Sequence, residues 1–146
     1  MAPYYDGLLA FLFRQLFYSI PDVPSVDLSG KTALVTGANS GIGYSLAMKL
    51  ATQGAQVIMA VRSVAKGEAA RKMILEKVPE ARIEIKGCDL ASFDSVMMLI
   101  NEISRESRSF DLVVLNAGVW SSELETSSDG IDISIQVSSI AISTLI

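Results

Sequence analysis

The stretch KTALVTGANSGIGYSLAMKL, residues 31–50, places an apolar run, three glycines and a helical pattern directly after one another. The apolar run Thr32–Thr36 predicts a buried strand. The glycines that follow it are Gly37, Gly41 and Gly43. A helix is then predicted to end near Gly54, because apolar residues recur at helical spacing at Ile42, Leu46, Ala47, Leu50 and Ala51.

A glycine turn between a strand and a helix is typical of phosphate-binding sites. Glycines let the backbone approach a pyrophosphate closely, and the positive end of the following helix faces the phosphates. The spacing Gly-x-x-x-Gly-x-Gly is not that of a P-loop, because no lysine follows Gly43. The pattern predicts a nucleotide-binding turn, and the alternative is a structural turn without a ligand.

The residues beyond Gly54 alternate between strand and helix patterns. Ser63 and Ser92 can each cap a helix, and Pro79 ends the first of the two. The second helix is predicted to bury Phe93, Val96, Met97, Ile100 and Ile103. The further strands are predicted at Gln56–Val61, Arg82–Lys86 and Asp111–Leu115. This alternation predicts an α/β fold with a doubly wound, Rossmann-like parallel sheet.

The strand patterns also predict the order of the strands. The runs ALVT, VIMAV and LVVL are continuously apolar, as in strands covered on both faces, whereas RIEIK alternates like an edge strand with one wet face. A spatial order of 3-2-1-4 follows. We expect the sheet to be truncated after the fourth strand, so that LVVL forms an exposed edge through which the chain could self-associate.

Three motifs carry a resemblance to a known family. TGANSGIG (residues 36–43), CDL (88–90) and LNAG (115–118) resemble, in order and spacing, the cofactor motifs of the short-chain dehydrogenase/reductase family. The segment before the glycines is similar to that of the retinol-dehydrogenase-like members, and the resemblance extends over residues 28–137. It implies that a nicotinamide cofactor is bound by Gly37, Asn39, Ser40, Gly41, Ile42, Gly43, Arg62, Asp89, Leu90, Asn116, Ala117 and Gly118.

The end of the second strand indicates which cofactor this is. Dinucleotide folds that bind NAD carry an acid there, whereas this chain has Val61 followed by Arg62. Because an arginine pairs with a 2′-phosphate, NADP(H) is favoured. Lys66 could assist, but the favoured interpretation of Lys66 is an ordinary surface residue. The alternative is that Arg62 is a solvated residue at a helix entrance. Asp89, which the resemblance places beside the adenine ring, could likewise be only a turn or capping residue.

The resemblance implies hydride transfer between nicotinamide and a small-molecule carbonyl or alcohol, but the catalytic residues of the family are missing. None of the four tyrosines is followed by a lysine four positions later, and Ser138 takes the position of the family's catalytic Asn. We therefore predict no catalytic residue, and the chain's own enzymatic status stays open. The chain is expected to be the cofactor-binding half of such an enzyme. We attribute the loss of resemblance after Val137 to a truncated transcript, a retained intron or a gene-model error. The alternative is a non-catalytic isoform or fragment that binds a nucleotide or a partner chain.

Composition excludes other classes of function. The net charge is −4 and no basic run occurs, so nucleic acid is not an expected partner. The chain has no histidine and one cysteine, Cys88, which excludes an internal disulfide, a His-based triad and a Cys/His metal centre, and fits a reducing compartment. We expect no metal site.

The first residues contain the most apolar stretch, residues 7–20. Its 14 residues are fewer than the about 20 that a membrane span needs. As an amphipathic helix it could pack on its own domain or lie on a membrane surface through Leu8–Ile20. The predicted units are an apolar helix and linker over 1–28, a partial NADP-binding domain over 29–137 and an atypical tail over 138–146. An intracellular location is expected, either cytoplasmic or peripherally membrane-associated.

Overall fold

Four strands and the helices that join them make up most of the described chain. The computed structural model describes residues 25–119 and 123–140. The strands are β1 (Thr32–Thr36), β2 (Gln56–Val61), β3 (Arg82–Gly87) and β4 (Leu112–Val114). The helices are α2 (Gly41–Thr52), α3 (Val64–Lys77), α4 (Phe93–Arg105), the single turn α5 (Ile133–Ile135) and the π-helical turn η1 (Gln136–Ile140).

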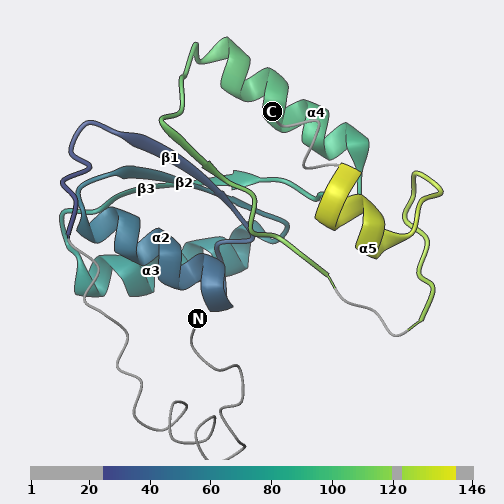
Figure 1. Ribbon diagram of the computed structural model, residues 1–146, viewed down its shortest axis with the longest axis horizontal. Coiled ribbons are helices and arrows are strands. Elements are labelled where there is room, and N and C mark those ends of the chain that lie inside the picture. The colour runs from purple at the N-terminus through teal and green to yellow at the C-terminus, as the bar shows by residue number, and fades with distance from the viewer. Residues whose placement is uncertain (1–24, 120–122, 141–146) are drawn as a thin grey trace, which may run out of the picture.

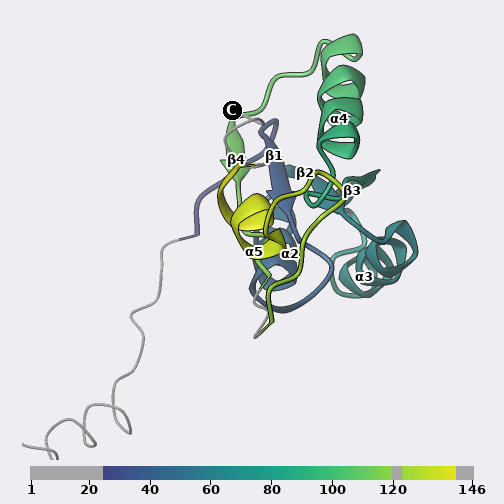
Figure 2. The ribbon, with the colours of Figure 1, turned by 90° about the vertical axis from the view of Figure 1, so that its right-hand side faces the viewer.

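The strands form one parallel sheet in the order β3-β2-β1-β4, which confirms the predicted topology. Helices α2 and α3 cover one face of the sheet, and α4 covers the other (Figures 1 and 2). Two buried clusters follow from this layering. Val35 and Met59 pack toward Ala47 and Ile74 on the first face. On the second face, Leu34, Ile58 and Ala60 pack with Val96, Leu99 and Val137.

The predicted helix ends are present. The Ser63 and Ser92 hydroxyls cap α3 and α4 by accepting hydrogen bonds from Lys66 N and Ser95 N, each at 3.4 Å. Gly54 has a φ of +91° just after α2, a left-handed conformation that glycine adopts without strain. The two serines therefore start α3 and α4, and the glycine follows the end of α2, as expected.

Two predicted core residues are exposed. Ile42 was expected on the buried stripe of α2, but it is 80% exposed because the first turn of the helix borders an open cavity rather than the sheet. Met97 was expected on the buried face of α4, but it is 46% exposed. The face that packs on the sheet is centred on Val96 and Leu99, and residue 97 lies about 100° around the helix from residue 96.

The polar face of β3 is wet only in part, which corrects the expectation for this edge strand: Arg82 is exposed and Glu84 partly exposed, but Lys86 is buried. The Lys86 side chain is only 8% exposed, because the C-terminal end of α4 covers it. Its Nζ lies 2.7 Å from Glu102 Oε1, 2.7 Å from Glu106 Oε1 and 2.8 Å from Glu84 Oε1. Arg108 Nη1 adds a contact of 2.6 Å to Glu84 Oε2. The sequence pattern of β3 is alternating because one face holds this charge cluster.

Replacing Lys86 by methionine is expected to lower the free energy of unfolding by about 2 kcal/mol at pH 7. The substitution leaves three carboxylates together without their shared cation. Although burial raises the pKa of Glu84, hydrogen bonds from Lys86 and Arg108 outweigh it and keep the pKa below 4.5. The cluster therefore stabilises the fold above pH 4.5, and this contribution is lost as the pH falls below that value.

Urea unfolding at pH 7 and near pH 4 measures this effect, with the exposed Lys72→Met as the matched control. We expect a smaller loss from Lys86→Met at the lower pH, where Glu84 begins to be protonated. An equal loss at both pH values would contradict the electrostatic explanation.

Strand β4 forms the second edge of the sheet, and its apolar side chains are partly uncovered. Leu112 is 37% exposed and Val113 is 43% exposed. The start of the strand is fixed to β1 through Asp111, whose carboxylate accepts hydrogen bonds from Lys31 Nζ (2.7 Å) and Thr32 N (2.9 Å). These bonds lower the pKa of Asp111.

The segment over residues 123–140 returns to the sheet as a short helical stretch. Apolar residues alternate within 131–137, a pattern typical of a strand, but the helical turns α5 and η1 are what form. The apolar segment at residues 7–20 lies outside the described residues. Among the residues that are described, no helix has the length and hydropathy needed to cross a membrane.

Candidate functional site

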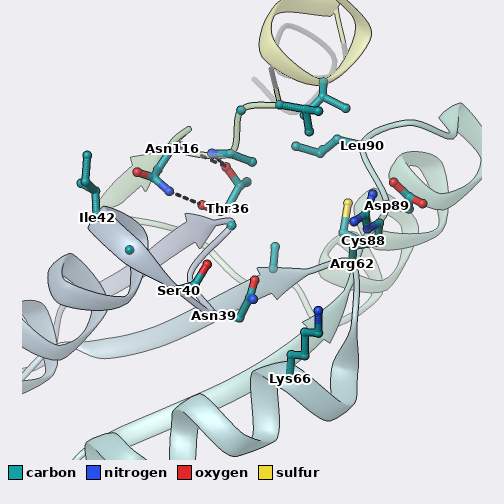
Figure 3. A pocket seen from close by; sticks show the side chains of 17 residues that line it. Thr36, Asn39, Ser40, Ile42, Arg62, Lys66, Cys88, Asp89, Leu90 and Asn116 are labelled. Carbon is teal, nitrogen blue, oxygen red and sulfur yellow. Dashed lines mark hydrogen bonds between the residues drawn. The ribbon is translucent and has the colours of Figure 1, made fainter. Parts of the chain in front are cut away.

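A cavity of about 650 Å³ opens at the carboxyl ends of the parallel strands. This is where ligands bind in open α/β sheets. All of the residues predicted to bind the cofactor line it except Gly43, and they come from the ends of β1, β2, β3 and β4 and from the start of α2 (Figure 3). The cavity is also lined by Lys66, which was considered as an assistant of Arg62, and by residues that were not predicted to bind cofactor: Thr36, Ala60, Cys88, Val119 and Val137.

The turn between β1 and α2 presents unpaired backbone donors to this cavity. The first helical bond of α2 runs from Tyr44 N to Ser40 O (3.1 Å), so the N–H groups of residues 41–43 precede the helical ladder. The Ser40 side chain makes no capping bond, and the first turn contains no acid. The positive end of the helix is therefore left for an anion.

Two of the glycines are required by close packing against the end of β4. Gly37 has a φ of +65°, and a Cβ atom there would lie 3.0 Å from Ala117 Cα. A Cβ atom on Gly43 would lie 2.5 Å from both Asn116 Nδ2 and Gly37 O. Gly43 does not line the cavity, but its missing side chain therefore lets the glycine turn pack closely against the end of β4. Gly41 has a φ of +56° and nothing within 4 Å of its Cβ position, so it leaves open space at the cavity.

Thr36, at the end of β1, fixes the end of β4. Its Oγ1 accepts hydrogen bonds from Asn116 N and Ala117 N, both at 3.0 Å, and its carbonyl oxygen accepts one from Asn116 Nδ2 (3.2 Å). This role was not predicted from the sequence. The available signal was the threonine directly before Gly37, because a hydroxyl there can accept from the neighbouring strand.

Two cations stand on one side of the cavity. Arg62 follows β2, and Lys66 lies in the first turn of α3; both side chains are exposed (Figure 3). Arg62 has no salt bridge within the described residues. No carboxylate takes the position of Val61, which is buried. This side of the cavity is therefore suited to an anionic group.

The turn after β3 forms a further side of the cavity. Asp89 Oδ1 accepts a hydrogen bond from Ala91 N (3.0 Å), and Asp89 N donates to Ser95 Oγ (2.9 Å) in α4. Asp89 therefore makes the contacts of a turn residue, which was the alternative considered for it. It also lines the cavity. Leu90, next to it, is buried against the second cluster.

Cys88 is expected to react slowly with thiol reagents. Burial, together with the charge of Asp89, raises the pKa of its thiol to about 11. At pH 8 the thiolate is then about a hundredfold scarcer than in an unfolded chain, which slows the reaction with Ellman's reagent accordingly. Because Cys88 is the only cysteine, the rate reports on this site alone. The urea-unfolded chain is the reference, and equal rates would contradict the buried placement.

Together, the parallel sheet, the glycine turn and the free helix start define a Rossmann-like nucleotide-binding fold. A family model described as short chain dehydrogenase matches residues 31–145. The chain belongs to this family of oxidoreductases, as the three motifs indicated.

Known proteins show the same relationship. The chain is 41% identical over 145 residues to the short-chain dehydrogenase fogG of Aspergillus ruber, covering 96% of this chain and 41% of that protein. It also resembles a metagenomic short-chain oxidoreductase solved in complex with NADP (TM-score 0.67, 32% identity, 82% of this chain and 54% of that one). L-sorbose reductase from Gluconobacter frateurii, complexed with NADPH and L-sorbose, matches with a TM-score of 0.70 and 27% identity, over 84% and 47% of the two chains. The chain thus spans about two fifths of the length of the curated relative.

Proposed function

We propose that this chain binds NADP(H) in the cavity at the carboxyl ends of its strands and supplies the cofactor-binding half of a short-chain oxidoreductase. The observation that carries the proposal is the placement of Arg62 and Lys66 on the cavity, at the strand end where NAD-binding folds carry an acid. The unit proposed to bind is residues 29–137. Relatives solved with NADP or NADPH support the same cofactor.

The residues fit the parts of this cofactor. The free N–H groups at the start of α2 and the open space at Gly41 would receive the pyrophosphate. Arg62 and Lys66 would receive the 2′-phosphate, which an arginine can bind with two parallel hydrogen bonds. Asp89 and Leu90 would line the adenine side, and Asn116, Ala117 and Gly118 the side that leads toward the nicotinamide.

The bound cofactor would supply or accept a hydride, with a small-molecule carbonyl or alcohol as substrate. The described residues that line the cavity bind and orient the cofactor. The sequence holds no tyrosine with a lysine four positions later to move the proton. We therefore propose nucleotide binding for this chain and assign hydride transfer to the oxidoreductase as a whole.

Arg62→Ala is expected to weaken NADPH binding by about 10- to 100-fold while NADH binding changes little, because a charged hydrogen-bond pair is lost only with NADPH. Fluorescence titration of both cofactors measures this, with the exposed Arg105→Ala on α4 as the matched control. Equal losses for the two cofactors, or equal affinities in the unmodified chain, would overturn the assignment of Arg62 to the 2′-phosphate. Absence of binding by a folded chain would overturn the proposed function.

A second candidate function is association with another polypeptide chain through β4. The partly exposed Leu112 and Val113 on this edge strand favour it, because an open strand edge offers unpaired backbone groups together with apolar side chains. Light scattering after size-exclusion chromatography at two concentrations tests it. A monomer at both concentrations would rule out self-association.

A further inference from the structure

A buried hydrogen-bond network joins the segment over residues 123–140 to the start of α4. Gln136 is 0% exposed, and its Nε2 donates to Asp129 Oδ2 at 2.5 Å. The same oxygen accepts a hydrogen bond from Phe93 N at 2.8 Å. Phe93 is the first residue of α4, so its N–H has no partner within the helix. One carboxylate oxygen therefore holds η1 and α4 together.

The other side of the Gln136 amide is satisfied within the same segment. The Ser127 hydroxyl donates to Gln136 Oε1 and accepts hydrogen bonds from Asp129 N (3.2 Å) and Ile131 N (3.4 Å). Ser127 N in turn donates to Ile131 O at 2.8 Å. Both polar ends of the buried amide thus have partners, as a buried polar group requires.

The start of α4 also holds the turn after β3, which forms another part of the cavity wall. Ser95, in its first turn, accepts the hydrogen bond from Asp89 N, in the turn that carries Leu90. Val137 directly follows Gln136 in the chain, is 6% exposed and belongs to the same apolar cluster as Leu90. Both Val137 and Leu90 line the cavity. Two parts of the wall, 47 residues apart in sequence, are therefore tied to one helix end.

We propose that Gln136 and Asp129 are positioning residues that hold Val137 against Leu90 and so build the adenosine side of the cavity. The proposal rests on the proposed function for its ligand. Apolar packing alone is not directional, whereas the Gln136–Asp129 hydrogen bond fixes the position of η1 on α4. When the bond is lost, a smaller fraction of molecules has the wall in place, and the apparent affinity for the adenosine part falls with that fraction.

Exchanging the donor and acceptor between the two residues tests this pairing. Gln136→Glu places a second carboxylate against Asp129 and is expected to weaken binding of NADPH and of adenosine 2′,5′-bisphosphate about tenfold. Adding Asp129→Asn restores the pair with the roles exchanged, because the amide N–H at position 129 can donate to the carboxylate at position 136. The amide oxygen at position 129 can still accept the hydrogen bond from Phe93 N. The double variant is expected to recover most of the affinity.

The reactivity of Cys88 gives a readout that needs no ligand. The thiol belongs to the same cluster as Val137 and lines the cavity, so Gln136→Glu is expected to speed its reaction with Ellman's reagent, and the double variant to slow it again. Ile74→Val is the matched control, because it perturbs the core on the opposite face of the sheet and leaves this segment untouched. It should change the melting temperature but neither the thiol rate nor the affinity.

The outcomes separate the two proposals. A Gln136→Glu variant that keeps the original thiol rate and nucleotide affinity, or a double variant that recovers neither, would overturn the positioning role. If the thiol rates follow the expected order but the unmodified chain binds neither probe, the positioning of Val137 stands and the proposed function fails.

Discussion

Gly43→Ala is expected to lower the free energy of unfolding by about 2–3 kcal/mol and to abolish binding of NADPH at concentrations that saturate the unmodified chain. The added methyl group would lie 2.5 Å from Gly37 O and from Asn116 Nδ2. Neither neighbour can move freely, because one is backbone and the other donates a hydrogen bond to Thr36 O. The methyl group therefore forces apart the glycine turn and the end of β4, which form two sides of the cavity.

Urea unfolding and cofactor titration together measure this effect. Gly87→Ala is the control, because a Cβ atom at Gly87 meets only Val64 Cγ2, at 3.4 Å, which is an ordinary van der Waals contact. We expect the control to change stability by less than about 1 kcal/mol. A Gly43→Ala variant as stable as the control, with intact binding, would show that the turn and β4 can separate without damage to the site.

Thr36→Val is expected to cost about 2–3 kcal/mol of stability, although valine has nearly the same shape as threonine. The hydroxyl of Thr36 is the acceptor for two backbone N–H groups, those of Asn116 and Ala117, and the side chain is 1% exposed. A valine leaves both donors without this acceptor next to a buried side chain. Because residues 116–118 line the cavity, cofactor binding is expected to weaken as well.

Thr36→Ser and Thr52→Val distinguish the hydroxyl from the methyl group. Serine keeps the acceptor and should retain most of the affinity, with a smaller loss of stability from the missing methyl. Thr52 donates to Met48 O from an exposed position on α2, so its replacement by valine should have little effect. If Thr36→Ser is as damaging as Thr36→Val, packing rather than hydrogen bonding holds the end of β4.

The sheet and the cavity could be predicted from the sequence because both depend on local patterns. Continuous apolar runs identified the inner strands β1 and β2, and the alternating run identified β3 as an edge, whereas the equally continuous run of β4 forms the other edge. The cavity lies where the carboxyl ends of those strands meet, so motifs at the strand ends had to come together. Gly37, Arg62, Asp89 and Asn116 meet there although they are far apart in sequence.

Features that depend on contacts between distant residues could not be predicted in the same way. Lys86 looked like a solvated residue because the sequence does not show that α4 crosses over it and brings Glu102 and Glu106 within reach. Gln136 is one polar residue within an apolar run of the sequence, and its partner Asp129 can be recognised only once both residues are seen to meet at the start of α4. Ile42 continues the apolar face of α2, but the first turn of this helix extends beyond the sheet, so Ile42 is exposed.

The central position of β1 has a consequence for the order in which the protein folds. β1 pairs with β2 after a connection of about 20 residues, but it pairs with β4 only after the whole of β2, α3, β3 and α4 has been made. Closing the longer loop costs more entropy, so we expect the β1–β4 contact to form last. The hydrogen bonds that Thr36 Oγ1 accepts from Asn116 N and Ala117 N belong to that contact. A nascent chain would therefore complete its three-stranded core first and acquire a binding-competent cavity only in the final step.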